Sequence, residues 1–146
     1  MFIRRALFRF LNLYFRPMGQ RWNIQYFQDD SGHSPFLEWS EKELSQEARE
    51  WLHEIIHRRL IIKGPDLSRT KWLSIIHYDL YQLRIIKNEK RGRQKILLRI
   101  YLCFDTDNQI TLLSGYDKGA DPSRERQTEE IQKALNFRDE WRERNA

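Results

Sequence analysis

Three closely spaced strand patterns in the second half of the chain constrain its fold more than any other feature. Leu80–Ile86 and Ile96–Phe104 are rich in isoleucine, leucine and tyrosine, and a polar connection containing a glycine separates them, as in a long hairpin. The turn residues Asp-Thr-Asp-Asn at 105–108 lead directly into a third pattern at Gln109–Tyr116. The sequence therefore predicts three consecutive antiparallel strands.

Alternation along these strands predicts which side chains share a face of the sheet. In the second strand one face is entirely apolar, which marks it as the core side: Ile96, Leu98, Ile100, Leu102 and Phe104. One register of the three strands places Arg84 and Arg99 together with Tyr116 and Lys118 on the opposite, open face. The pattern predicts a small cationic and aromatic patch there, without a carboxylate.

The segment before these strands predicts one more strand and a helical hairpin. Trp22–Phe27 alternates as a strand does, and Ser34-Pro35 combines a hydroxyl N-cap with a proline at the first helical position. Ser45 caps a second helix, which Lys63-Gly64-Pro65 ends. Its apolar stripe is predicted to consist of Ala48, Leu52, Ile55, Ile56, Arg59 and Ile62.

The remaining segments complete an α+β order of β-α-α-β-β-β-α. Asp66–His77 is predicted to be a loop anchored by Trp72 and Leu73. A last helix begins at Asp121-Pro122 or Ser123, and one of its sides carries Ile131, Ala134, Leu135, Arg138 and Trp141. With 146 residues the chain has the length of one domain with a real core.

Charge divides unevenly along the chain. Residues 63–104 hold ten basic and three acidic residues, whereas residues 22–62 and 105–146 are both net acidic. Such a concentration of positive charge suggests a polyanion such as RNA or DNA as partner, although a solvated loop is the simpler interpretation of the connection alone. The candidate RNA-binding residues in this connection are Lys87, Lys90, Arg91, Arg93 and Lys95.

Residues 1–21 form a basic, aromatic extension ahead of a domain at 22–146. They contain five arginines and no acid, and arginines interrupt every apolar run that could serve as a signal peptide or span a membrane. Three interpretations stay open: a helix packed on the domain or a partner, a helix on a membrane surface, or an over-long gene start with Met18 as the true initiator. The last two are favoured jointly, and a membrane partner is not expected for the domain.

One cysteine and scattered histidines exclude several kinds of site. Cys103 has no disulfide partner and cannot build a cysteine-rich metal site, which fits a reducing cytoplasm. His53 and His57 stand four residues apart on a helix, but they lack a third ligand nearby and are interpreted as helix-surface residues. No metal or other cofactor is predicted.

Four short motifs follow one another in the second half of the chain: LYQLR at 80–84, LRIYL at 98–102, LLSGYDK at 112–118, and Pro122 ahead of the last helix. In this order they resemble the RelE/HigB superfamily of bacterial toxins, and most closely its phage-derived, HigB-like branch. That branch shows an LYELR strand, a YRVLY strand, a strand ending in LLHGFxKK, and a final helix that opens near a proline. The resemblance covers about residues 22–143 and is strongest from Leu80 to Leu135.

The resemblance implies a RelE-like, microbial-RNase-type fold, in which helices cover one face of a twisted antiparallel sheet and the active site lies on the other. Members of the family are mostly type II toxins that cut messenger RNA in the ribosomal A site without a metal. A cognate antitoxin, often with a helix-turn-helix domain, neutralises them. We therefore expect a cytoplasmic, ribosome-dependent endoribonuclease that inhibits translation, and the catalytic residues carried over are Arg84, Arg99, Tyr116 and Lys118.

The chemistry assigns a role to each candidate. Arginine forks suit the charge of a phosphorane, so Arg84 and Arg99 are expected to clamp the phosphate while Lys118 holds a neighbouring one. Tyr116 would transfer a proton, if nearby cations lower its pKa, or stack on a base. His77, near the start of the first of the three strands, is a further candidate for proton transfer.

Two departures from the branch pattern keep a second function class open. Ser114 stands where the branch often has histidine, and Gly119 stands where it often has a second lysine. Both losses are compatible with a non-catalytic RNA- or DNA-binding module on the same fold. A third possibility is a protein-interaction module tethered to a membrane surface through its N-terminus.

Overall fold

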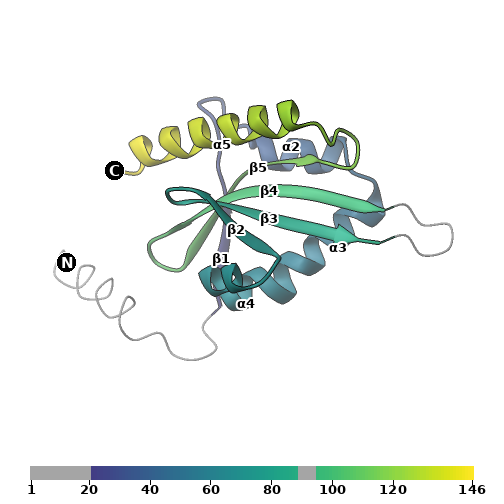
Figure 1. Cartoon of the computed structure of the whole chain (residues 1–146). Coiled ribbons are helices and arrows are strands. Elements are labelled where there is room, and N and C mark those ends of the chain that lie inside the picture. Colours follow the sequence, from purple (N-terminus) through teal and green to yellow (C-terminus); the bar gives the residue numbers. More distant parts are fainter. Residues whose placement is uncertain (1–20, 89–94) are drawn as a thin grey trace.

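A computed structural model describes residues 21–88 and 95–146, which form an α+β fold built on a five-stranded sheet (Figure 1). The strands lie in the order β1-β5-β4-β3-β2, with bounds β1 Asn23–Tyr26, β2 Leu73–His77, β3 Leu80–Lys87, β4 Ile96–Asp105 and β5 Gln109–Asp117. The α+β class and the three central strands are confirmed. Residues 1–20 of the extension, with Lys90, Arg91 and Arg93, lie outside the described residues.

The sheet is mixed, so the prediction of a purely antiparallel sheet is wrong. Strands β2 to β5 pair antiparallel, but β1 pairs parallel with β5, and Asn23 lies opposite Gln109. A parallel pair needs a long connection. Here it includes most of the domain, and no local sequence signal announces it.

The segment predicted as a loop, Asp66–His77, instead contains a 3-10 helix η2 (Gly64–Arg69) and the edge strand β2. Strand β2 joins β3 through Tyr78 and Asp79, and Asp79 adopts a positive φ of 62°. The alternation along this edge strand is weak. Leu73 and Ile75 lie on the same face of β2, yet Leu73 is fully buried while Ile75 is 61% exposed.

Helices α2 (Pro35–Lys42) and α3 (Gln46–Ile55) cover one face of the sheet. The predicted caps are confirmed, since the Ser34 hydroxyl accepts from Leu37 N and the Ser45 hydroxyl accepts from Ala48 N, both at 3.2 Å. The predicted apolar face of β4 packs on the same core, which contains Leu52, Ile55, Leu98, Ile100 and Leu102.

The end of the second helix departs from the predicted stripe. A π-helical turn η1 (Ile56–Leu60) follows α3 and continues into the short helix α4 (Ile61–Lys63). Such a turn adds a residue to the helical repeat and rotates the following face. Leu60 and Ile61 are therefore buried, whereas Arg59 and Ile62, which had been predicted to lie on the stripe, are exposed.

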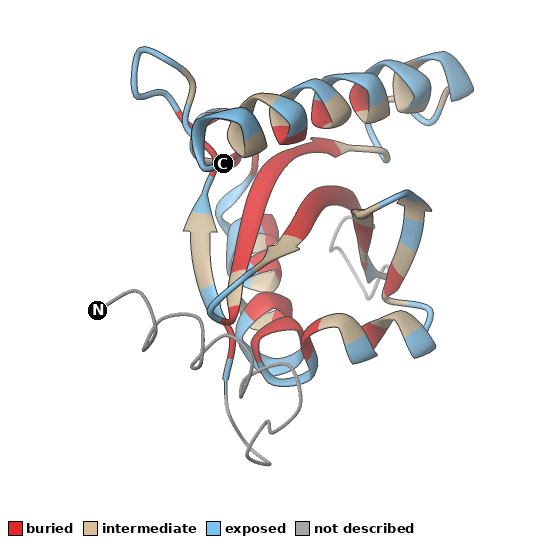
Figure 2. Cartoon of the chain, turned by 90° about the vertical axis from the view of Figure 1, so that its left-hand side faces the viewer, coloured by how far each residue is buried: buried red, intermediate tan, exposed pale blue. Residues whose placement is uncertain are grey.

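Helix α5 (Arg124–Arg144) lies on the opposite face of the sheet, so the prediction that the helices cover only one face is wrong (Figure 2). Its start is as predicted, because the Ser123 hydroxyl accepts from Arg126 N at 3.2 Å. The buried side chains of this second core are Phe27, Leu80, Tyr101, Cys103, Leu113, Tyr116 and Ala134. The face predicted to be open is thus partly covered by α5.

None of the helices in the described parts of the chain is long and apolar enough to cross a bilayer.

Candidate functional site

Arg84, Arg99 and Tyr116 form a continuous row across three strands. Arg84 on β3 lies directly opposite Arg99 on β4, and Arg99 lies directly opposite Tyr116 on β5. Directly opposed residues of antiparallel strands place their side chains on the same face. The predicted register of the three strands is therefore confirmed, while the role of the row stays a prediction.

The two arginines have no carboxylate partner among the described residues. Neither guanidinium forms an ion pair there, and the Nε atoms of both are buried without a hydrogen-bond partner. Arg99 is 7% exposed, and its side chain makes one long hydrogen bond, from Nη1 to Leu98 O at 3.4 Å. Burial, followed by the charge of Arg84, lowers the pKa of Arg99. Two adjacent, unpaired cations with free donors are a ready site for an anion.

Lys118 extends the positive charge beyond the row. Burial lowers its pKa, and the charges of Arg99 and Arg84 lower it further, which places the ammonium within the field of the pair. Its Nζ donates to Gln127 Oε1 on α5 at 3.3 Å.

A hollow opens beside Lys118, with a volume of about 560 Å³, and its lining includes Lys95, Leu97, Ala120 and Pro122. Gly119 also lines this hollow. Lys95 therefore adds a second positive charge beside Lys118.

Tyr116 belongs to the row but is completely buried under α5. The guanidinium of Arg126 lies 5.5 Å from the centre of its ring, and the ring of Tyr101 lies parallel to it with the two centres 6.4 Å apart. Burial outweighs the nearby cations and raises the pKa of Tyr116, so the expectation of a lowered pKa is wrong. Base stacking on this ring is blocked as long as α5 lies over it.

A buried carboxylate lies beside the tyrosines, which corrects the prediction of a patch without one. Glu130 on α5 is 4% exposed and accepts from Arg126 Nε at 2.9 Å and Lys133 Nζ at 3.4 Å. Its charge acts on both Tyr101 and Tyr116. The i, i+4 spacing of Arg126 and Glu130 is visible in the sequence, but nothing local predicts that they lie over the row.

Below the row the same face continues as a buried polar layer. Tyr101 and Ser114 are cross-strand partners, and the Tyr101 hydroxyl donates to Gln82 Oε1 at 3.0 Å. The hydroxyl of Ser114 is buried without a hydrogen-bond partner among the described residues, whereas the buried hydroxyl of Tyr116 interacts with that of Tyr101. The register shifts by one residue next to Ser114, as in a β-bulge. Unsatisfied polar atoms beside the arginine pair make this layer part of the candidate site.

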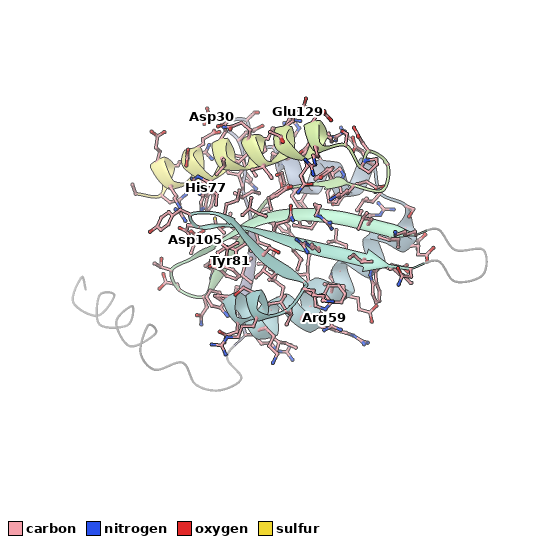
Figure 3. The ribbon with its side chains drawn as sticks, viewed as in Figure 1. Asp30, Arg59, His77, Tyr81, Asp105 and Glu129 are labelled. Carbon is pink, nitrogen blue, oxygen red and sulfur yellow. The ribbon has the colours of Figure 1, made fainter. Side chains whose placement is uncertain are left out.

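The other predicted residues lie elsewhere. Lys87 pairs with Glu47 at 3.5 Å and lies over the ring of Trp51 at 4.9 Å, so it is engaged with α3. His77 is the last residue of β2 and lies opposite Leu80, the first residue of β3, in the β2–β3 hairpin (Figure 3). Its partner Leu80 precedes Arg84 by four residues, or about 13 Å along the strand. The structure therefore does not bring His77 to the row.

Neither a protein-family model nor a curated protein matches the chain.

Within the described ranges, no group of three or more histidine, cysteine or acidic side chains could hold a metal ion. His53 and His57 do lie together, with ring centres 3.9 Å apart, but no third ligand joins them there.

Proposed function

We propose that this chain is a RelE/HigB-type toxin with a RelE-like fold, an endoribonuclease that cuts messenger RNA on the ribosome. The observation that carries the proposal is the pair Arg84 and Arg99, which are adjacent, half-buried and buried respectively, and without an anionic partner among the described residues. Leaving buried cations unpaired costs stability, so a binding role for an anion explains their presence better than a structural role does.

The reaction would be a transesterification within RNA. The 2′-hydroxyl gives its proton to solvent water as its oxygen bonds to phosphorus, the bond from phosphorus to the 5′-oxygen breaks, and the two guanidinium groups stabilise the charge of the phosphorane between them. Lys118 would hold a neighbouring phosphate. Tyr116 would donate a proton to the departing 5′-oxygen rather than accept one from the 2′-hydroxyl, because a phenol with an ordinary pKa of about 10 is protonated at neutral pH.

The burial of Tyr116 has a consequence for this mechanism. The phenol reaches RNA only if the first turns of α5, with Arg126 and Glu130, move aside. We assign no general base among the described residues, and we propose that the ribosome contributes by orienting the messenger RNA.

The proposed partners are the ribosome, messenger RNA and a cognate antitoxin with a helix-turn-helix domain, and the proposed location is the cytoplasm.

A non-catalytic RNA-binding module is the second candidate function, and one observation favours it. The phenol of Tyr116 is buried with a raised pKa, and His77 lies about 13 Å along β3 from the row, so the groups for proton transfer are poorly placed. The arginine pair would bind a phosphate equally well without cleaving RNA.

Mapping of RNA 5′ ends after brief induction separates these functions. The test compares the wild type with the double variant Arg84→Ala/Arg99→Ala. The control is Arg58→Ala/Arg69→Ala, which removes two exposed arginines and so matches the change in charge. Cuts in phase with the ribosome that vanish only in the first variant support the toxin. Growth arrest without cuts supports the binding module.

The conservative variant Arg84→Lys/Arg99→Lys sharpens the result. Lysine keeps both charges but lacks the planar fork of donors, so cleavage should fall strongly even though the charge is unchanged. Full cleavage by this variant would contradict a clamp that depends on the guanidinium geometry. Equal growth arrest by the wild type and Arg84→Ala/Arg99→Ala would place the activity elsewhere on the molecule.

A further inference from the structure

An exposed apolar row lies directly beside the arginine row. Ile86 on β3 is the cross-strand partner of Leu97 on β4, just as Arg84 is the partner of Arg99. Residues two apart on a strand share a face, so the two rows lie on the same face and about 7 Å apart. Ile86, the next-to-last residue of β3, is 42% exposed, and Leu97 is half-buried.

The apolar row continues into the hollow. Leu97 forms part of its wall together with Ala120 and Pro122, and Lys95 and Lys118 supply positive charge at the same place. The hollow therefore offers apolar surface to a flat, uncharged group and cations to the phosphates attached to it. At about 560 Å³ it has room for a nucleobase and surrounding water.

We propose that Ile86, Leu97 and the adjoining hollow form a subsite for one unpaired nucleobase of a single-stranded RNA. This inference rests on the proposed function, because the phosphate held by Arg84 and Arg99 anchors the nucleotide whose base enters the subsite. The separation of the two rows is comparable to the distance between the phosphate and the base of one nucleotide. A base within a duplex is stacked and paired and cannot reach the row, so the site selects single strands.

Charge favours this occupant over an apolar side chain of a protein partner. The face around the row carries Arg84, Arg99, Lys95 and Lys118, and the Asp117 carboxylate at the hollow already accepts backbone hydrogen bonds from Gly119 at 2.9 Å and Ala120 at 3.3 Å. An apolar surface framed by cations suits a nucleotide, which has both a flat base and a charged phosphate.

Binding measurements with two matched oligonucleotides test the subsite. One is a short single strand with 2′-O-methyl riboses, which cannot be cleaved, and the other has the same backbone without bases. In Ile86→Ser the affinity for the base-bearing strand should fall about five- to tenfold, while the affinity for the abasic strand stays unchanged. The matched control is Ile75→Ser, which removes another exposed isoleucine, on the edge strand β2, and should change neither affinity.

A gain-of-function variant keeps the test valid if Ile86→Ser folds poorly. Tyrosine is well tolerated in strands, and an aromatic ring on the row should tighten binding of the base-bearing strand several-fold in Ile86→Tyr but not in Ile75→Tyr. In the wild type, a hairpin of the same composition should bind more weakly than the single strand, and this difference should shrink in Ile86→Ser.

The outcomes separate the subsite from the proposed function. If Arg84→Ala/Arg99→Ala weakens both oligonucleotides but Ile86→Ser behaves like Ile75→Ser, the subsite is overturned, the phosphate clamp stands, and the apolar row is left as a contact for a protein partner. If the wild type binds neither oligonucleotide, the subsite is overturned, whereas the proposed function, in which the ribosome orients the RNA, is decided separately by the mapping of RNA 5′ ends. Loss of affinity for the base-bearing strand alone in Ile86→Ser supports both.

Discussion

The arginine pair should destabilise the protein when no anion is bound, so replacing Arg99 with methionine is expected to raise the free energy of unfolding. Arg99 is 7% exposed, lies opposite Arg84 and leaves its Nε without an acceptor. An unsatisfied buried donor costs about 1–3 kcal/mol. Like charges directly opposite each other on neighbouring strands add to this cost. Methionine removes both costs and keeps the apolar contacts of the stem.

The long hydrogen bond from Arg99 to Leu98 O is lost in this variant, which offsets part of the gain. We therefore expect Arg99→Met to be more stable by about 1–2 kcal/mol. For a chain of this size that corresponds to a rise in Tm of about 2–8 °C. Thermal and urea unfolding in a buffer without phosphate or sulfate measures the difference. Added phosphate should then raise the Tm of the wild type but not that of Arg99→Met, because only the wild type binds it.

Arg84→Met is the matched variant. Arg84 is only half-buried, so its replacement should gain less than that of Arg99. The double variant should gain less than the sum of the two, since the repulsion between the arginines is removed only once. If Arg99→Met is instead less stable than the wild type by more than about 1 kcal/mol, stabilising contacts hold the guanidinium in place and the argument for an empty anion site is refuted.

Two further predictions concern the covered part of the site. Glu130→Gln should lower the free energy of unfolding by about 1–3 kcal/mol, because Arg126 loses a charge-assisted hydrogen bond. Urea unfolding measures this change, and faster nitration of the Tyr116 ring would report a looser α5. Unchanged stability and an unchanged nitration rate would contradict the prediction. Burial raises the pKa of the Cys103 thiol from 9.0 to about 12, so the unfolded thiol ionises first and stability should fall as the pH rises from 9 towards 12. Cys103→Ala should flatten the decline in the free energy of unfolding between pH 9 and 10, a range that lies below the ordinary pKa of tyrosine, 10.0. An equally steep decline in the variant would exclude ionisation of Cys103 as its cause.

The parts of the fold that could be predicted are those with a local signal. Alternation within β4 distinguished its two faces, and turn residues on either side set the order of the strands, so the row of Arg84, Arg99 and Tyr116 followed from parity alone. The hydroxyl caps at Ser34 and Ser45 were also readable, since a cap needs only one side chain and the first turn of its own helix.

The parts that could not be predicted depend on contacts between distant segments. The parallel pairing of β1 with β5 and the weak pattern of the edge strand β2 leave no clear local trace. The apolar side of α5 around Ala134 indicates that the helix packs against something, but not which face of the sheet it covers. This choice of face decides that Tyr116 is buried and that Glu130 lies beside it.

The sites where the sequence breaks the ordinary rules of sheet stability coincide with the candidate site. Two arginines opposite each other, an exposed isoleucine near the end of β3 and the buried hydroxyl of Ser114 without a partner each cost stability, and all lie on the same face of β3, β4 and β5. The opposite face of the same strands is mostly apolar, with Lys87 and Asp117 at the strand ends, although Trp39 Nε1 and Glu47 Oε1 on the helices that cover it are also buried without a partner among the described residues. Because most of these costs gather on one face, a ligand that removes them together explains the pattern. An anion with a flat apolar group attached, such as a nucleotide within RNA, would do so.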